Sequence, residues 1–350
     1  MKKNILIPAL SCLALLASCS NPSPSNSSVE SSETPAPETV TFATPTGAPT
    51  LAFYDQATNP NWFSSSQPAT QILPLFTNNN YDAVVFDGTQ ALTNISTNQR
   101  DYTLAKWISS GAFYVVSTKH DAAYVPTSKP RVYAFMPQGN ISKAFRTLAK
   151  NAWNWGEYGA SSDEFVTYGA AVSDVQAALA SMIKAGSTEG DLYDYYLIAD
   201  PAYSALSAQF KKANLTLHTI YDMNAEFQKK YSCDIPAAAI FLNKTNYASK
   251  KASLDAWLDG VQKAMDVVAT NLDAVIPVVK ATDADDGSNA KFGVSSAALT
   301  IVKNRTGKDQ NPFRYHKTGE IATAAEKASF ANAFQTAIGE KAFDESLFSN

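Results

Sequence analysis

Two aspartates, Asp87 and Asp200, each stand between a strand-like segment and a segment that begins like a helix. A pair of carboxylates can perform general acid–base chemistry when a fold brings the two together. An aspartate directly before a helix is also a common N-cap, and a carboxylate in such a position can contact a ligand. We favour separate N-cap or ligand-contact roles for the two residues over a catalytic pair.

The remaining chemistry-bearing residues form no recognisable catalytic or metal-binding motif. The sequence contains neither HExxH nor GxSxG. The acidic run 283–286 is the one candidate for a metal site, and we interpret it as a solvated loop before Gly287. The three histidines are scattered along the chain: His120, His218 and His316. We therefore expect no catalytic residue, no metal, no cofactor and no enzymatic activity.

The stretch Val40–Phe53 shows which elements could position such side chains. Residues 40–44 have strand character and run into a Pro/Gly-rich turn at 45–49, and Thr50 is the expected N-cap of a following helix. This order leaves free backbone N–H groups at the carboxyl end of the strand. Ligands bind at that edge in open α/β sheets. The same order of strand, turn and helix start recurs at 81–92.

Strands and helices alternate along the chain, which predicts an α/β fold. A helix with Ser173 as N-cap is expected from its apolar spacing, and 304–318 is expected to be a surface loop. We expect the strand 235–242 to return to the first domain. Further strands are predicted at 104–108, 113–116, 131–135, 165–168, 194–199 and 215–220, and helices at 141–150, from Ala202 and from Tyr247 onward.

Length and composition limit the possible classes of protein. The chain has 350 residues, which suggests two domains. Its net charge is -4 and it has no dense Lys/Arg stripe, so nucleic acid is not an expected partner. Of the 3 cysteines, only Cys233 falls outside the N-terminal region, so the folded part cannot hold an intrachain disulfide.

The N-terminus predicts a lipid anchor. Lys2 and Lys3 precede an apolar segment at 5–16 that is too short to span a membrane as a mature helix. Leu16-Ala17-Ser18-Cys19 resembles a bacterial lipobox, which predicts a signal peptide over 1–18 and lipidation, with palmitate, at Cys19. Residues 19–38 are predicted to be a disordered tether. An uncleaved anchor and a plain secretory signal are the alternatives.

With this N-terminus, the organisation resembles substrate-binding lipoproteins of ABC importers. Within that group it is similar to the nitrate/sulfonate/thiamine-precursor binding proteins, which have a type II periplasmic-binding fold. The resemblance implies two lobes, 39–118 plus 236–350 and 119–235, each a mixed sheet flanked by helices, with two hinge crossings near 117–129 and 231–236. It also implies a monomer that is held on the extracytoplasmic face of the cell membrane and delivers a small molecule to an ABC permease.

The resemblance also implies where a ligand would bind. The expected contacts lie on loops after strands of both lobes: Thr44, Thr46, Gly47, Asp87, Gly88, Thr89, Ser110, Gly111, Gln138, Gly139, Asn140, Tyr168, Asp200 and Tyr203. No catalytic residue is implied by this mechanism, in which ligand binding biases a hinge.

The residues in these loops suggest a class of ligand. They include no arginine, and Lys143 is the only basic residue nearby. Because a dianion usually recruits arginine, we expect a neutral or cationic, ring-containing, thiamine-precursor-like ligand, with Asp87 or Asp200 facing any positive charge. A sulfonate- or nitrate-type anion binder, a non-transport surface lipoprotein and a hydrolase on the same scaffold are the alternatives. The candidate stacking residues are Trp62, Trp107, Trp153, Trp155, Tyr168 and Tyr203.

Overall fold

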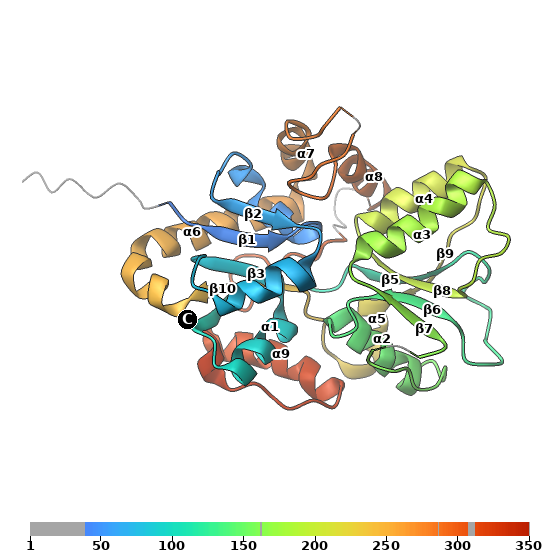
Figure 1. The fold of residues 1–350 in the computed structure, drawn as a ribbon, viewed down its shortest axis with the longest axis horizontal. Coiled ribbons are helices and arrows are strands. Elements are labelled where there is room, and N and C mark those ends of the chain that lie inside the picture. Colours follow the sequence, from blue (N-terminus) through green and yellow to red (C-terminus); the bar gives the residue numbers. More distant parts are fainter. Residues whose placement is uncertain (1–38, 162, 286, 307–311, 350) are drawn as a thin grey trace, which may run out of the picture. The chain divides into compact units, whose positions relative to one another are not determined.

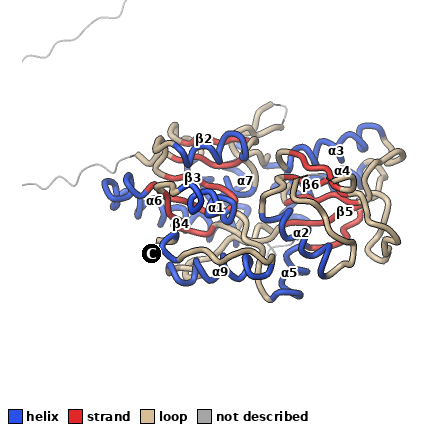
Figure 2. The backbone as a smooth tube through the Cα atoms, turned by 60° about the horizontal axis from the view of Figure 1, so that its bottom comes forward, coloured by secondary structure: helices blue, strands red, loops and turns tan. Residues whose placement is uncertain are grey.

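The computed structural model describes residues 39–350 apart from 162, 286, 307–311 and 350. The predicted signal peptide 1–18, the lipidation site Cys19 and the tether 19–38 lie outside the described residues. Within the described part, no helix is both long and apolar enough to cross a bilayer. The predicted mixed α/β architecture is confirmed, because two five-stranded sheets are each flanked by helices (Figure 1; Figure 2).

The first sheet has the strand order β2-β1-β3-β10-β4. Strand β1 pairs in parallel with β2 and β3, whereas β10 runs antiparallel to both β3 and β4. The predicted return of the chain to the first sheet is confirmed by β10. The strands are β1 (Phe42–Pro45), β2 (Trp62–Ser65), β3 (Ala83–Asp87), β4 (Tyr102–Trp107) and β10 (Ala238–Asn243).

The second sheet has the strand order β7-β6-β8-β5-β9. Strand β6 is parallel to β7 and β8, and β5 is antiparallel to β8 and β9. The strands are β5 (Phe113–Ser117), β6 (Val132–Phe135), β7 (Val166–Gly169), β8 (Tyr195–Ala199) and β9 (His218–Asp222). We call each sheet with its flanking helices a lobe, so that β5 belongs to the second lobe.

Helices follow most of the strands and cover the sheets. In the second lobe, α3 and α4 lie on one side of the sheet and α2 and α5 on the other (Figure 1). The helices are η1 (Ala48–Gln56), η2 (Pro68–Ile72), η3 (Leu73–Thr77), α1 (Gly88–Asn98), α2 (Asn140–Asn151), α3 (Val172–Ala185), α4 (Ala202–Lys212), α5 (Met223–Tyr231), α6 (Lys244–Thr270), α7 (Leu272–Lys280), α8 (Ser296–Thr306), α9 (Ala324–Ala337) and η4 (Glu345–Leu347).

Two predicted helix starts are wrong. The segment η1 is a 3-10 helix that begins after Gly47, and the Thr50 hydroxyl donates to the carbonyls of Gly47 and Phe292 instead of capping. Helix α3 begins after Ala171, so Ser173 lies inside its first turn. There the carboxylate of Asp174, and not the hydroxyl of Ser173, accepts the N–H groups of Ala170 and Ala171.

The chain passes between the lobes at 109–112 and again at 235–237. The two segments are joined to each other, because the Gly111 N–H donates to Ile235 O at 3.1 Å and the Ala237 N–H donates to Ser109 O at 3.0 Å. The first passage therefore precedes β5, whereas the sequence suggested a boundary at 118/119. The apolar residues of β5 resemble a continuation of β4, and only the small residues between them mark the passage.

A third segment, 313–316, packs against this junction. The Ser110 N–H donates to Arg314 O at 3.2 Å, and the His316 N–H donates to Ile108 O at 2.9 Å. Phe313, Tyr315 and His316 are buried. The prediction of a surface loop over 304–318 is wrong for these buried residues, and the side chains of Phe313 and Tyr315 belong to the core of the first lobe.

Helix α9 contributes to the hydrophobic cores of both lobes. Ala328 and Ala331 pack with the first sheet beside Trp107, whereas Phe334 belongs to the core of the second lobe. Lys143 of α2 also pairs with Glu340, just after α9, at 3.0 Å. The lobes are thus connected by a packed helix as well as by the crossing segments.

Candidate functional site

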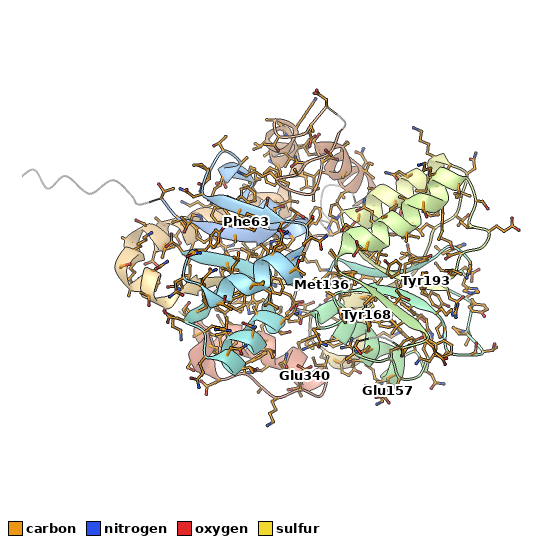
Figure 3. All side chains as sticks on the ribbon, in the orientation of Figure 1. Phe63, Met136, Glu157, Tyr168, Tyr193 and Glu340 are labelled. Atoms are coloured by element: carbon orange, nitrogen blue, oxygen red, sulfur yellow. The ribbon has the colours of Figure 1, made fainter. Side chains whose placement is uncertain are left out.

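A cavity of about 660 Å³ lies where strand ends and helix starts of the two lobes meet. Its walls include 45–49 at the end of β1, Phe135, Met136 and Gly139 at and after the end of β6, and 199–202 at the end of β8. Figure 3 shows Met136 between the lobes, in agreement with its packing against cores of both. The volume suits a small organic molecule.

The cavity brings together six of the predicted ligand contacts. These residues come from the first lobe, from the crossing segment and from the second lobe: Thr46, Gly47, Asp87, Gly111, Gly139 and Asp200. The arrangement follows from the sequence pattern, because all of them except Gly111, which lies in the crossing segment, stand at a strand end or in the turn after it.

Eight predicted contacts do not line the cavity: Thr44, Gly88, Thr89, Ser110, Gln138, Asn140, Tyr168 and Tyr203. Several of them have structural partners instead. Thr44 is buried and its hydroxyl accepts the Trp62 Nε1–H at 2.8 Å. Tyr203 stacks on Tyr114 with centroids 4.3 Å apart. Gly88 packs so closely on Trp107 that an added Cβ would lie 1.9 Å from the ring.

Gln138, Tyr168, Ser110 and the pair Thr89–Asn140 are also engaged within the protein. Gln138 is exposed and its amide donates to Ala160 O at 3.4 Å. The Tyr168 hydroxyl donates to Gly159 O at 3.0 Å. Ser110 belongs to the crossing segment, and the Thr89 hydroxyl donates to the Asn140 side chain.

Asp87 has a double role at the cavity. Its Oδ1 accepts the Gln90 N–H at 3.1 Å and caps α1, so the predicted N-cap is confirmed. Its Oδ2 accepts the Asn140 N–H, at the start of α2, at 2.7 Å. Burial raises the pKa of Asp87 to about 6, although the two N–H groups and the nearby Lys143 ammonium favour the charged form.

Asn140 holds this junction together from the second lobe. It is buried, and its side-chain Nδ2–H donates to the carbonyl of Pro236 in the second crossing segment at 2.6 Å. Its Oδ1 accepts the Thr89 hydroxyl of α1. One asparagine therefore connects α1, α2 and a crossing segment beside the cavity.

Asp200 is engaged at the start of α4. Its Oδ1 accepts the N–H and the hydroxyl of Ser204, at 3.1 and 2.5 Å. Asp200 is 3% exposed, although it lines the cavity. Each of the two cavity aspartates is therefore bound to a helix start of its own.

The cavity is acidic. Among the lining residues that the structure describes, the charged ones are Asp87 and Asp200, with no lysine, arginine or histidine. Lys143 pairs with Glu340 outside this cavity. The helix starts that face the cavity are occupied by the protein's own carboxylates, Asp87 at α1 and α2, Asp174 at α3 and Asp200 at α4. An added anion would meet the negative charge of these carboxylates.

The aromatic residues of the cavity differ from those predicted. The six predicted stacking residues are not among the lining residues; Trp153, for example, stacks on Tyr221 at 4.3 Å and Trp155 on Tyr195 at 4.4 Å. The cavity instead uses four phenylalanines: Phe86, Phe113, Phe135 and Phe313. The sequence offered a signal for two of them, because Phe86 and Phe135 are at or next to the last residue of a strand.

Two further parts of the wall were missed from the sequence. The loop 287–295 of the first lobe lies on the turn after β1, where a Cβ on Gly293 would meet Thr46 at 2.5 Å. Gln176 of α3 and Gln209 of α4 supply polar groups from the second lobe. In the sequence, the two glycines of this polar loop are only a weak indication of a binding site. Glutamines on the face of a helix give no such indication.

The remaining candidate groups, Asp283 and Cys233, do not line the cavity. No cluster of three or more His, Cys, Asp or Glu side chains suited to a metal is present among the described residues. Asp283, from the acidic run, accepts the N–H and hydroxyl of Ser296 at the start of α8, at 3.1 and 2.5 Å. Burial raises the pKa of the half-buried Cys233 thiol to about 11, so it is protonated at neutral pH.

Comparison with known proteins identifies the fold. No protein-family model matches the chain, and no curated protein matches it in sequence. The structure of an ABC transporter from Parabacteroides distasonis is 14% identical with a TM-score of 0.59, over 89% of this chain and 98% of that one. The alkanesulfonate-binding protein of Xanthomonas axonopodis pv. citri is 13% identical with a TM-score of 0.56, over 88% and 97%.

The periplasmic nitrate-binding protein of Synechocystis PCC 6803 is 10% identical with a TM-score of 0.56, over 88% of this chain and 86% of that one. Another similar structure, from Candida albicans, is described as having the generic periplasmic binding protein fold, at 8% identity and a TM-score of 0.55, over 89% of this chain and 93% of that one. The chain therefore has the periplasmic binding protein fold, as the sequence predicted.

Proposed function

We propose that this protein is a lipid-anchored solute-binding protein that works with an ABC permease on the extracytoplasmic face of the cell membrane. The observation that carries the proposal is the cavity, whose walls come from strand ends of both lobes. A ligand there touches both lobes, so its binding energy stabilises the arrangement in which they meet. The segments 109–112 and 235–237 are the hinge in this mechanism. Lipidation at Cys19 and a monomeric state complete the proposal.

The ligand is small, neutral or cationic, and contains a ring, as in a thiamine precursor. Two carboxylates and no described basic side chain line the cavity, which disfavours an anion. Phe113, which is partly exposed, offers aromatic surface to a ring, and Gln176 and Gln209 offer hydrogen bonds. The two similar proteins named for sulfonate and nitrate share the fold at low identity, which leaves the ligand of this chain to be argued from its own cavity.

A thermal-shift screen, followed by calorimetry, tests the ligand class. Pyrimidines and aromatic amines are compared with sulfonates, nitrate and amino acids. A ligand present at a hundred times its dissociation constant stabilises the protein by about 2.7 kcal/mol. We expect stabilisation by a neutral or cationic ring compound and none by the anions. Tight binding of a sulfonate or nitrate alone would overturn the ligand class, and the absence of any binding would overturn the transport function.

The anchor is tested separately from the ligand. Mass spectrometry of the protein extracted from membranes should find a lipid-modified N-terminal Cys19, and Cys19→Ala should release the protein from the membrane fraction. An intact N-terminus with unmodified Cys19 in membranes would contradict the lipoprotein prediction while leaving the binding function standing.

A further inference from the structure

Asn140, the first residue of α2, bonds outside its own lobe through its backbone N–H and through both polar atoms of its side chain. Its N–H donates to Asp87 Oδ2 at 2.7 Å, and its Nδ2–H donates to Pro236 O at 2.6 Å. Its Oδ1 accepts the Thr89 hydroxyl. Asp87 and Thr89 belong to the first lobe and Pro236 to the second crossing segment. All three bonds therefore join the second lobe to the parts of the chain against which it moves.

The orientation of the Asn140 side-chain amide is fixed by these partners. The Pro236 carbonyl can only accept a hydrogen bond, so the NH₂ group of the amide must face it. The amide oxygen then faces the Thr89 hydroxyl, which donates. Asn140 is 1% exposed, so water does not take the place of either partner. A side chain that lacks the donor or the acceptor would leave a buried polar group unpaired, which is costly.

The neighbouring glycines make these contacts possible. A Cβ on Gly139 would lie 3.3 Å from Asp87 Oδ2, so the carboxylate approaches the start of α2 closely because residue 139 has no side chain. From the first lobe, the Gly88 N–H donates to Ala237 O at 3.0 Å. Adjacent carbonyls of the second crossing segment, at Pro236 and Ala237, are thus bonded to the second and the first lobe respectively.

We propose that Asn140 is a positioning residue for solute binding, which holds the lobes in their joined arrangement and thereby raises the affinity of the cavity for its ligand. This inference rests on the proposed function, because it takes the cavity between the lobes as the ligand site. When the lobes separate, the bonds of Asn140 to Asp87 and Thr89 are lost together. Apparent affinity falls with the fraction of molecules in the binding-competent arrangement, so fewer joined molecules bind more weakly.

Other contacts limit the size of the effect. Helix α9 packs in the cores of both lobes, and Lys143 pairs with Glu340 at 3.0 Å. These contacts remain when the side-chain bonds of Asn140 are removed. Loss of the Asn140 bonds therefore loosens the junction beside the cavity without detaching a lobe.

The variant Asn140→Asp separates this role from a local role in α2. Aspartate is favourable in the first turn of a helix, so the change would be harmless if Asn140 served α2 alone. Between the lobes it is unfavourable, because a carboxylate cannot donate to the Pro236 carbonyl and places a second negative charge beside Asp87. Small-angle X-ray scattering of the full-length, ligand-free protein should show a larger radius of gyration than wild type, while circular dichroism shows the same helix content.

The variant Thr89→Val tests the same contact from the first lobe. Valine keeps the size of the side chain but removes the hydroxyl that donates to Asn140. Amide hydrogen exchange followed by NMR should show protection at residue 140 to fall about tenfold in Asn140→Asp, and by a smaller factor in Thr89→Val. The Gln90 amide, bonded to Asp87 within the first lobe at 3.1 Å, should keep its wild-type protection. This combination indicates separation of the lobes and excludes unfolding of α1.

Asn243→Asp is the matched control. Asn243 is a buried residue that caps α6, where its Oδ1 accepts the Asn246 N–H and its Nδ2–H donates to Asn79, all within the first lobe. Its replacement should leave both the radius of gyration and the protection at residue 140 at their wild-type values.

An unchanged radius of gyration in Asn140→Asp, or unchanged protection at residue 140 in Thr89→Val, would overturn the proposal. If Asn140→Asp does not fold, the exchange measured in Thr89→Val decides alone. Because no ligand enters these measurements, a negative result leaves the proposed function standing. An unsuccessful ligand screen would overturn the proposed function, and these measurements would still decide whether Asn140 holds the lobes together.

Discussion

The ring of Phe334 on α9 lies 5.4 Å from the ring of Phe227 on α5, so a helix that begins beside the first sheet ends in the core of the second lobe. Both side chains are fully buried. The C-terminal part of the chain thus connects the lobes independently of the two crossing segments. This connection is absent from the sequence pattern, which shows only an amphipathic helix.

Phe334→Ala should lower the stability of the protein strongly. Removing a buried phenylalanine typically costs about 3–5 kcal/mol, and here it also removes the contact of α9 with the second lobe. Urea unfolding followed by circular dichroism measures the loss. Phe330→Ala is a matched comparison, because the Phe330 ring packs on Trp107 in the first lobe at 5.1 Å. Only Phe334→Ala should also increase the radius of gyration of the native protein; equal dimensions for both variants would contradict this role of α9.

Gly111→Ala should disturb the crossing segment. Gly111 has a φ of 66°, and an added Cβ would lie 2.8 Å from Arg314 Cδ and 3.0 Å from Asn224. We expect a loss of about 2 kcal/mol or more from backbone strain together with the steric conflict. Gly319→Ala is the control, because Gly319 has a φ of 86° but open space around it. The difference between the melting temperatures of the two variants measures the conflict at the crossing, and equal values would rule it out.

Ala205→Trp should block the cavity. Ala205 of α4 lines the cavity, and α4 packs against α8 of the first lobe, so a large side chain there competes with ligand and hinders the meeting of the lobes. We expect the affinity for any ligand found by the thermal-shift screen to fall at least tenfold (about 1.4 kcal/mol). Lys211→Trp adds the same bulk to an exposed position on α4 and should bind normally. If calorimetry gives the same affinity for Ala205→Trp as for wild type, the ligand binds outside this cavity.

The stability of the protein should depend on pH through Asp87. Its pKa is about 6 in the folded protein and about 4 in the unfolded chain, so its contribution is full below pH 4 and is lost as the pH rises through 6. At pH 7.5 the buried charge costs about 3 kcal/mol. Asp87→Asn should be more stable than wild type there by about 2 kcal/mol, after a lost hydrogen bond is counted. Urea unfolding at pH 4 should show no gain in stability of Asp87→Asn over wild type. A gain that is the same at both pH values would contradict the titration of Asp87.

The sequence predicts the parts of the site that depend on local order along the chain. Asp87 is recognisable as a cap because it stands between an apolar strand and a helix start. Gly47, Gly139 and Asp200 are recognisable for the same reason, and all of them line the cavity. The continuous apolar run at 235–242 predicts a buried strand, which is the β10 that returns to the first sheet. These features need only the residues a few positions away.

The features that the sequence does not predict depend on residues far apart. The second oxygen of Asp87 binds the N–H of Asn140, which lies 53 positions away. Phe313 lines the cavity, although it belongs to the segment 304–318, whose polar and aromatic residues predict a surface loop. The prediction of the six stacking residues depends on side-chain type alone, and in the structure they do not line the cavity. Side-chain type indicates what chemistry is available, whereas tertiary packing decides which residues perform it.

The carboxylates of Asp87 and Asp174 give the helix starts beside the cavity built-in counterions. If the proposed ligand class is correct, these carboxylates disfavour anions by their charge alone, without a bulky side chain that blocks the cavity. Replacing one of these aspartates by a small neutral residue would leave backbone N–H groups at a helix start free to bind a sulfonate or a nitrate. On this proposal, a change in selectivity between anionic and uncharged solutes would require very few mutations.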